Sequence, residues 1–265
     1  QELIFSTCRL LKCMLDFDKG VASDLPKAIE GAFIFSVVWS IGGCVDGDGR
    51  AKFDTFLRQM CAAEIYDTKE WEDFKIKNPD YVEDSGRKTV IALPDNDGAV
   101  IYDFFFDCKT AKYASWLADA PTFKIERDAK FNSILVPTID TIRNEWLLEI
   151  LLIKGNHVMC TGDTGTGKSV TIKSKLLSGM PDNFTSPINL NFSAQTSANQ
   201  TQDLIDSKLD KRRKGVFGPP LGQTTIVFVD DLNMPTKEIR EKHQYNTIDN
   251  SQYATHYNIR MQKIF

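Results

Sequence analysis

An eight-residue run near the middle of the chain has the residue types and spacing needed to hold a polyphosphate. It fits the pattern G-x-x-x-x-G-K-[ST] at every fixed position. A loop of this kind turns successive backbone N–H groups toward one point, and its small residues let an anion approach them closely. We therefore predict a phosphate-binding loop made of Gly162, Asp163, Thr164, Gly165, Thr166, Gly167, Lys168 and Ser169.

The segments on either side of the run strengthen this interpretation, because the pattern alone arises by chance in about one chain in a hundred of this length. His157 to Cys160 is predicted to be a short buried strand, and Val170 to Met180 a helix closed by Gly179 and Pro181. In a strand, loop and helix of this order, Lys168 neutralises the β- and γ-phosphates and Ser169 is a Mg²⁺ ligand at the start of the helix.

Two adjacent aspartates follow a later apolar segment and suit the metal of such a site. Thr225 to Val229 is predicted to be a strand, and Asp230 and Asp231 come directly after it. On its own this pattern favours an ordinary buried strand with a polar end. Together with the phosphate-binding loop, it favours Asp230 as a carboxylate that supports Mg²⁺.

The composition is that of a globular chain of 265 residues, long enough for one large or two modest domains. The formal net charge of -4 gives no overall attraction to nucleic acid or anionic lipid. The longest apolar run, Ala32 to Ile41, is interrupted by Ser36 and Ser40, so we expect no membrane span. The first residues carry neither an initiator Met nor a basic leader, which is typical of a piece of a longer protein.

The cysteines are scattered, without a C-x-x-C pair or a histidine at ligand spacing. We expect them to be small buried hydrophobic residues in a reducing compartment rather than zinc ligands or disulfides. They are Cys8, Cys13, Cys44, Cys61, Cys108 and Cys160.

The first part of the chain is predicted to be a small helical bundle followed by a hairpin. Helices are expected over residues 3–17 and 26–39, and over a segment in which Phe53, Phe56, Leu57 and Met60 share one face. Asp46, Asp48 and Asp54 resemble the carboxylates of a calcium loop, but helix capping fits their spacing better. Residues 62–87 are expected to be an exposed connection, and Thr89–Leu93 and Ala99–Phe106 a β-hairpin. The aromatic run Tyr102, Phe104, Phe105 and Phe106 is expected to be packing surface.

A second unit is predicted to begin near Pro121. Residues 131–137 are expected to be extended, and Thr138 to cap a helix that ends at Gly155. The buried stripe of that helix is predicted to be Ile139, Ile142, Trp146, Ile150 and Leu151. Ile188, Leu190 and Phe192 alternate as a strand, and Ser197–Asp210 reads as a helix. A basic cluster follows this helix and consists of Lys208, Lys211, Arg212, Arg213 and Lys214. We expect it to be a solvated loop rather than a phosphate or partner contact.

Several long strings in this order resemble the dynein heavy chain family in its axonemal form. The third AAA+ module of its motor ring is similar to Val136–Arg143, Gly162–Ser169, Asn191–Ser197, Lys214–Pro220 and Val227–Pro235. The lid of the preceding, second module is similar to Ile29–Gly42 and Asp48–Phe53. The resemblance covers about residues 1 to 236 and implies a P-loop AAA+ α/β fold: an incomplete parallel sheet with flanking helices, after a small α-helical lid and a β-hairpin linker.

This resemblance implies domains and site residues. The domains would be a lid over 1–70, a linker with the hairpin over 71–120, a partial P-loop subdomain over 121–236 and a divergent tail over 237–265. By the same resemblance ATP and Mg²⁺ are the cofactors, Val136, Pro137 and Thr138 border the adenine, and Ser169 and Asp230 support the metal.

The resemblance also implies a setting. The parent would be a microtubule motor of the ciliary axoneme, within the cytoplasm and cytoskeleton. Its partners would be neighbouring AAA+ modules, intermediate and light chains, and microtubules reached through other parts of the protein, with no nucleic acid or membrane among them.

Two departures from the family pattern bear on activity. Many AAA+ ATPases place Glu at the position of Asp231 as the catalytic base, and Asp is one methylene shorter. A misplacement of about 1 Å can cost on the order of 10²-fold in rate, so we expect a slow, regulatory site. The alternative is a structural module that binds nucleotide without hydrolysis.

The second departure is the tail, where residues 236–265 match none of the family's fourth strand, sensor or lid. Tyr257, Ile259 and Met261 alternate as a substitute for the fourth strand. We therefore expect no steady ATPase activity from the isolated polypeptide.

Overall fold

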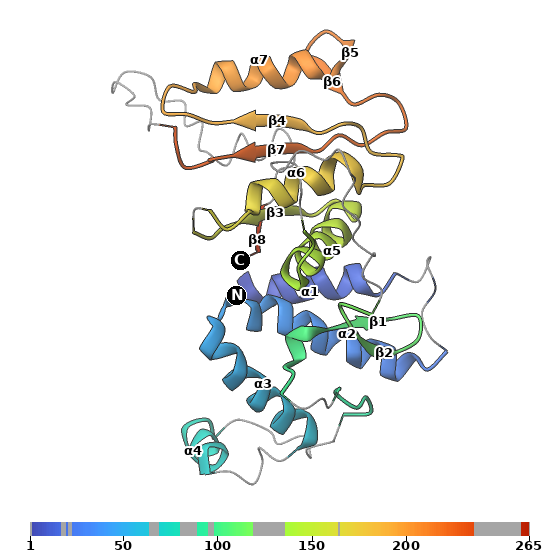
Figure 1. Ribbon diagram of the computed structural model, residues 1–265, viewed down its shortest axis with the longest axis vertical. Helices are drawn as coiled ribbons and strands as arrows, with labels where there is room; N and C mark the ends of the chain where they lie inside the picture. Colours follow the sequence, from blue (N-terminus) through green and yellow to red (C-terminus); the bar gives the residue numbers. More distant parts are fainter. Residues whose placement is uncertain are drawn as a thin grey trace. The chain divides into compact units, whose positions relative to one another are not determined.

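The computed structural model describes the chain except residues 1, 17–19, 21–22, 64–68, 80–88, 95–97, 119–135, 164, 236–260 and 265. The chain forms two compact units. Unit 1 comprises Gln1–Thr161 with Met261–Phe265, and unit 2 comprises Gly162–Arg260. Figure 1 labels their elements.

Unit 1 is mainly helical. Its α-helices are α1 (Glu2–Met14), α2 (Leu25–Ser40), α3 (Gly47–Ala62), α4 (Lys69–Lys77) and α5 (Ile139–Ile153). Two 3₁₀ turns, η2 (Gly42–Cys44) and η4 (Ile101–Asp103), lie between them in sequence. Helices α1 and α2 pack side by side (Figure 1). The predicted helices over 3–17 and 26–39 are confirmed, except that the first ends at Met14.

Local capping chemistry fixes where these helices begin. The Asp46 carboxylate accepts a hydrogen bond from the Gly49 backbone N–H at 2.8 Å, and the Thr138 hydroxyl accepts one from the Thr141 N–H at 3.2 Å. Each bond satisfies a backbone donor that has no partner in the first helical turn. The predicted capping roles of Asp46 and Thr138 are thus confirmed. Asp54, however, is buried in α3 and accepts hydrogen bonds from Arg58 and from the Ile101 N–H.

The core of unit 1 is a cluster of aromatic rings. Their centroids lie 5.6 to 6.4 Å apart, mostly in tilted or edge-to-face arrangements, which suit the charge distribution of π-systems. The rings belong to Phe35 and Trp39 of α2, Tyr102 of η4, Trp116, and Trp146 of α5. Tyr102, Phe104 and Phe106 are buried, which confirms that this aromatic run is packing surface.

The buried faces of α3 and α5 differ from the predicted ones. In α3 the buried residues are Asp54, Leu57 and Cys61, whereas Phe56 and Met60 are exposed. In α5 they are Arg143, Leu147, Leu148 and Leu151, with the predicted Ile139, Ile142, Trp146 and Ile150 only partly buried. A buried arginine belongs to this face because its guanidinium lies 5.0 Å from the centre of the Trp39 ring and pairs with Asp140.

Helix α2 and the turn after it form a long apolar stretch. By length and composition alone, Leu25–Cys44 is able to cross a membrane, contrary to the expectation that no run is long enough. Yet 56% of that stretch is buried inside the structure. Ala28, Ala32, Phe35 and Val38 of this helix belong to the buried core, so its apolar character is used in packing.

The predicted hairpin is wrong in its position. The observed antiparallel pair is β1 (Phe104–Asp107) with β2 (Lys112–Ser115). The segment from Thr89 is not a strand, because its backbone donors bond elsewhere: the Ile91 N–H to the Glu30 carboxylate at 2.7 Å and the Thr89 N–H to the Cys61 carbonyl at 3.0 Å. Hydrogen bonds to residues distant in sequence therefore take the place of the strand pairing that the β-branched residues of this segment favoured.

The structure bears on two further expectations for unit 1. The described part of residues 62–87 is mostly exposed, as expected, and contains helix α4, in which Trp71 stacks on Phe74 at 5.2 Å. The six cysteines are all free, but only Cys13 and Cys61 are buried, while Cys8, Cys44 and Cys160 are exposed. The expectation that all six cysteines are buried is therefore wrong.

The strand before the phosphate-binding loop is β3 (His157–Cys160), as predicted. It pairs in parallel with β8 (Met261–Ile264), which places a strand of the tail beside it. Of the alternating residues proposed for this strand, Met261 lies in β8, while Tyr257 and Ile259 lie outside the described residues. The prediction that β3 is buried is wrong, because three of its residues are partly buried and Cys160 is exposed.

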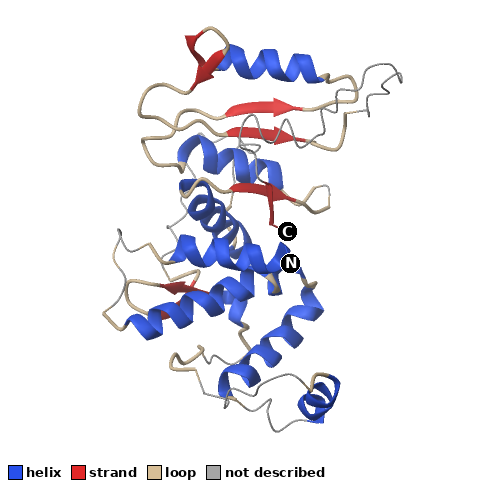
Figure 2. Cartoon of the chain, turned by 180° about the vertical axis from the view of Figure 1, so that it is seen from behind, coloured by secondary structure: helices blue, strands red, loops and turns tan. Residues whose placement is uncertain are grey.

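Unit 2 contains a parallel strand pair with a helix beside each strand. Strand β4 (Ile188–Asn191) pairs with β7 (Val227–Asp230), while α6 (Lys168–Ser178) lies near β7 and α7 (Ala198–Lys208) near β4 (Figures 1 and 2). Alternate residues of β4, Ile188 and Leu190, are buried with Ile205 of α7. The predicted strand and both predicted helices are confirmed.

The basic cluster of unit 2 is not a loop. Strands β5 (Asp210–Arg213) and β6 (Val216–Gly218) form an antiparallel hairpin with an irregularity between Lys211 and Arg213. Every residue of β5 is exposed, so the cluster lacks the alternation of apolar and polar residues by which a strand is recognised. The expectation of solvent exposure holds, and the expectation of an irregular loop is wrong.

Candidate nucleotide-binding site

The phosphate-binding loop of unit 2 owes its shape to glycines in the left-handed region. Gly165 and Gly167 have φ angles of 80° and 78°, and an added Cβ at either position would meet nothing within 4 Å. Conformation rather than space therefore requires glycine here. Gly167 directly precedes α6, which begins at Lys168. Thr164 lies outside the described residues.

Lys168 lies over the loop that precedes it. Its ammonium donates hydrogen bonds to the Asp163 carbonyl and, at 3.0 Å, to the Thr166 hydroxyl. The Thr166 hydroxyl in turn donates to the Asp163 carbonyl at 2.9 Å. One cation and the N-terminus of a helix are thus gathered at a single short loop, which is the electrostatic requirement for binding a phosphate group.

Ser169 connects this loop to strand β7. Its hydroxyl donates a hydrogen bond to one carboxylate oxygen of Asp230 at 2.7 Å, across 61 residues of sequence. Because Asp230 is the last residue of β7 and Ser169 lies in the first turn of α6, the two elements meet through their functional side chains. The structure brings together the two residues that the sequence assigned to a metal.

Lys173 is a further member of the site. Its ammonium lies 3.0 Å from the second carboxylate oxygen of Asp230 and 5.5 Å from the centre of the Phe228 ring. Sequence reasoning missed this residue. The available signal was its spacing from Ser169, since positions i and i+4 share one face of a helix.

These two contacts set the ionisation of Asp230. Burial raises the pKa of its carboxyl, but the hydrogen bonds from Ser169 and Lys173 and the charge of Lys173 outweigh that effect. The pKa of Asp230 is therefore lowered, and the group is an anion at neutral pH. An anionic carboxylate next to a hydroxyl oxygen is a donor set of the kind Mg²⁺ prefers, so these residues fit the ion.

Asp231 follows Asp230 in an unusual backbone conformation. Its φ is 54°, in the left-handed region, and its side chain is exposed. Aspartate tolerates this region better than most residues that carry a Cβ. The Asp231 carbonyl accepts a hydrogen bond from the Met234 N–H at 3.0 Å, which closes a turn directly after β7. Its catalytic role stays a prediction.

The residues predicted to border an adenine lie in unit 1. Val136 is 61% exposed, Pro137 is partly buried, and Thr138 caps α5. Their role toward a base also stays a prediction.

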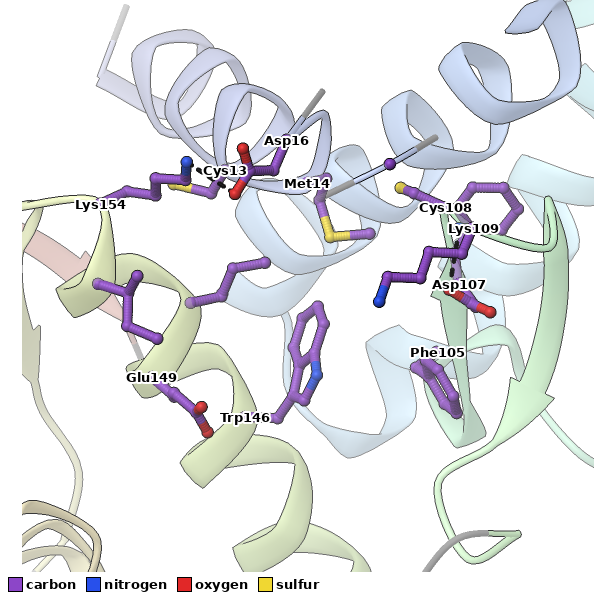
Figure 3. Close-up of a pocket in the computed structure, with 14 residues that line it drawn as sticks. Cys13, Met14, Asp16, Phe105, Asp107, Cys108, Lys109, Trp146, Glu149 and Lys154 are labelled. Atoms are coloured by element: carbon purple, nitrogen blue, oxygen red, sulfur yellow. Dashed lines mark hydrogen bonds and ion pairs between the residues drawn. The ribbon is translucent and has the colours of Figure 1, made fainter. Parts of the chain in front are cut away.

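A cavity lies in unit 1, and its chemistry differs from that of the phosphate-binding loop. This cavity of about 290 Å³ is lined by α1, β1 and α5, with Trp146 and Phe105 among its walls (Figure 3). Lys154 at its edge is paired with Asp16 at 2.8 Å, and burial raises the pKa of the lining Cys108 thiol to about 11, so that the thiol stays protonated. Its carboxylates and its neutral thiol make it unsuited to a polyphosphate.

Known proteins match the two parts of the chain separately. Residues 1–118 match the dynein heavy chain AAA lid domain. Residues 123–248 match the P-loop containing dynein motor region.

This chain belongs to the dynein heavy chain family.

Among its relatives are dynein axonemal heavy chain 1 of Mus musculus, 43% identical over 217 residues, and dynein axonemal heavy chain 12 of Homo sapiens, 39% identical over 211 residues. These alignments cover 82% and 79% of this chain. Dynein axonemal heavy chain 3 of Homo sapiens is 35% identical over 253 residues, or 90% of this chain. The chain spans only 5% to 6% of the length of these dynein relatives.

The family match bears out several predictions from the sequence. The fold is an incomplete P-loop AAA+ α/β fold with a lid, and a P-loop motor region of this family implies nucleotide binding. The prediction of an axonemal type agrees with the relatives named above.

Proposed function

We propose that this dynein chain contributes a MgATP-binding module to the motor ring of an axonemal heavy chain that drives ciliary, microtubule-based movement. The observation that carries the proposal is the hydrogen bond between Ser169 and Asp230. It joins the helix after the phosphate-binding loop to the carboxylate at the end of β7, as a shared metal-nucleotide site requires.

In this proposal each residue of the loop has a distinct task. Gly165 and Gly167 hold the backbone so that its N–H groups point at phosphate, and Lys168 leaves its contacts in the loop to pair with the anion. Bound Mg²⁺ would neutralise phosphate charge. Ser169 and Asp230 would hold it through oxygen atoms. Val136, Pro137 and Thr138 would border the adenine.

We further propose that the site is slow and regulatory. Asp231 would orient the attacking water, but its side chain is one methylene shorter than that of Glu, and its left-handed backbone restricts the directions the side chain can take. A displacement of about 1 Å is expected to cost on the order of 10²-fold in rate. The isolated 265-residue chain is proposed to lack steady ATPase activity.

The alternative is a module that binds ATP only to brace the ring. The exposed position of Asp231 and the ion pair that occupies one oxygen of Asp230 favour this reading. In either case the partners are neighbouring AAA+ modules of the heavy chain, with intermediate and light chains and microtubules reached through other regions. The setting is the cytoskeleton of the axoneme.

An intact ring that carries substitutions at this site would test the proposal. Asp231→Glu should raise ATP turnover at this site by up to about 10²-fold if the site is a slow ATPase. Lys168→Ala should reduce nucleotide occupancy there, and it should also lower turnover. If Lys168→Ala removes the nucleotide and leaves turnover unchanged, the bracing role is correct. Unchanged nucleotide occupancy in Lys168→Ala would contradict both readings.

A further inference from the structure

The two oxygens of the Asp230 carboxylate have different partners: one accepts a hydrogen bond from a hydroxyl, and the other is paired with an ammonium group. Ser169 donates to Oδ1 at 2.7 Å, while the Lys173 ammonium lies 3.0 Å from Oδ2. The metal-binding carboxylate proposed above is therefore already paired with a cation of the same chain.

Lys173 is held at this place by more than one contact. The side chain of Lys173 is 36% exposed and that of Asp230 is 21% exposed. The ammonium also lies over the Phe228 ring at 5.5 Å. Phe228 and Asp230 belong to the same strand, β7. A cation shared between a ring and a carboxylate of one strand is more confined than a lysine in a simple surface pair.

We infer that Lys173 is a positioning residue that sets the Mg²⁺ requirement of this nucleotide site, an inference that rests on the proposed function. The ammonium holds Oδ2 and so aims Oδ1 at Ser169. Its positive charge also reduces the negative charge that Asp230 offers to a second cation. Mg²⁺ must bind against this repulsion, so Lys173 raises the Mg²⁺ concentration at which metal and nucleotide bind together.

The effect depends on charge, which separates it from a purely structural role. Methionine has nearly the length of lysine and can lie over the same ring, but it carries no charge. Arginine keeps the charge. Lys175 is a control on the same helix, because its side chain lies beside Gly179 at the C-terminal end of α6.

The experiment measures binding of a fluorescent ATP analogue to the full 265-residue chain as Mg²⁺ is varied. For Lys173→Met we expect the half-maximal Mg²⁺ concentration to fall by about three- to tenfold, the size for one partly exposed charge acting on a divalent ion. Lys173→Arg and Lys175→Met should keep the wild-type value within about twofold. With Mg²⁺ removed by EDTA, Lys173→Met should bind the analogue as the wild type does.

Each other result has a defined meaning. An unchanged or higher Mg²⁺ requirement in Lys173→Met would overturn the inference alone, as would an equal change in Lys175→Met. Equal loss of affinity with and without Mg²⁺ would also overturn it, because Lys173 would then act on the phosphates directly. Absence of saturable binding in the wild type would overturn the proposed function, and the inference with it. If circular dichroism shows that Lys173→Met does not fold, Lys173→Gln serves as the uncharged variant.

Discussion

Unit 1 and unit 2 use polar groups for different purposes. In unit 1 the polar atoms complete the packing of a large aromatic core: the Tyr102 hydroxyl donates to the Gly42 carbonyl at 2.7 Å, and Asp54 accepts from the Ile101 N–H. In unit 2 a small buried cluster supports short strands, and Asp230 at the end of β7 pairs with the Lys173 ammonium and accepts a hydrogen bond from Ser169. We infer that the first unit is built for stability and the second to hold a charged ligand.

The sequence supplies separate probes for the two units. All four tryptophans, at positions 39, 71, 116 and 146, lie within unit 1, and residues 162–260 contain none. Tryptophan fluorescence therefore reports the unfolding of unit 1, whereas nucleotide binding reports unit 2. The predictions below use this difference, and the largest expected effect comes first.

Trp39→Ala should lower the free energy of unfolding of unit 1 by about 3 to 5 kcal/mol, because it removes a large buried ring and leaves a cavity. Trp39 is 5% exposed and packs against Phe35, Tyr102 and Trp116. Urea unfolding followed by the fluorescence of the remaining tryptophans measures the loss.

Trp71→Ala is the matched control for this variant. Trp71 stacks on Phe74 in the short helix α4, away from the buried cluster, and its loss should cost about 1 kcal/mol or less. Equal losses in the two variants would show that the aromatic core does not dominate the stability of unit 1.

Alkaline pH should destabilise unit 1 through Tyr102. Burial raises the pKa of this phenol to about 12, from about 10 in an unfolded chain. Because the folded-state pKa is the higher one, the contribution is complete below pH 10 and is lost as the pH rises toward 12. The loss amounts to about 2 to 3 kcal/mol.

Urea unfolding between pH 9 and pH 11.5 tests this titration. Tyr102→Phe should reduce the slope without removing it, because burial also raises the pKa of Tyr113. A slope that is the same in Tyr102→Phe as in the wild type would contradict the assignment.

Two glycines should respond differently to the same substitution. A Cβ on Gly31 would lie 2.3 Å from the Phe106 ring, so Gly31→Ala should cost unit 1 about 1 to 3 kcal/mol by overpacking. A Cβ on Gly165 would meet nothing within 4 Å, so Gly165→Ala should lower the free energy of unfolding only through the strain of an alanine in the left-handed region, about 1 kcal/mol. The same variant should weaken nucleotide binding.

Fluorescence unfolding and nucleotide titration of both variants separate these effects. Gly31→Ala should lower the free energy of unfolding measured by fluorescence. Gly165→Ala should lower the affinity measured by nucleotide titration. The reverse pattern would contradict the division of roles between the two units.

The smallest expected effect is the acid titration of Asp230. Its folded-state pKa lies below that of the unfolded chain, so its contribution is present above about pH 4 and is lost as the pH falls through the folded value. The wild type should lose slightly more stability than Asp230→Asn between pH 5 and pH 3, measured by urea unfolding with far-ultraviolet circular dichroism. An Asp230→Asn chain that loses as much as the wild type would argue against the paired carboxylate.

Features set by a few neighbouring residues could be predicted from the sequence. The caps at Asp46 and Thr138 were confirmed, since each depends on a side chain and a backbone N–H within three residues. The pairing of Ser169 with Asp230 was also accessible, because the order of motifs implies it.

Features that depend on distant partners could not be predicted in this way. The segment from Thr89 has strand-forming residues, yet Glu30 accepts its backbone hydrogen bond from a position 61 residues earlier. The exposed, charged strand Asp210–Arg213 lacks the alternation of apolar and polar residues by which a strand is predicted from sequence. Lys173 was missed because its role depends on an ion pair to a strand that follows 57 residues later.

The most direct test is a titration of the 265-residue chain with ATP in the presence of Mg²⁺, compared with Lys168→Ala and the charge-matched control Lys175→Ala. The account predicts saturable binding by the wild type and by Lys175→Ala, and a loss of at least about tenfold in affinity for Lys168→Ala, since a charged contact to phosphate contributes about 1.5 to 3 kcal/mol. Equal affinity in all three chains, or no binding by the wild type, would contradict a nucleotide site in unit 2.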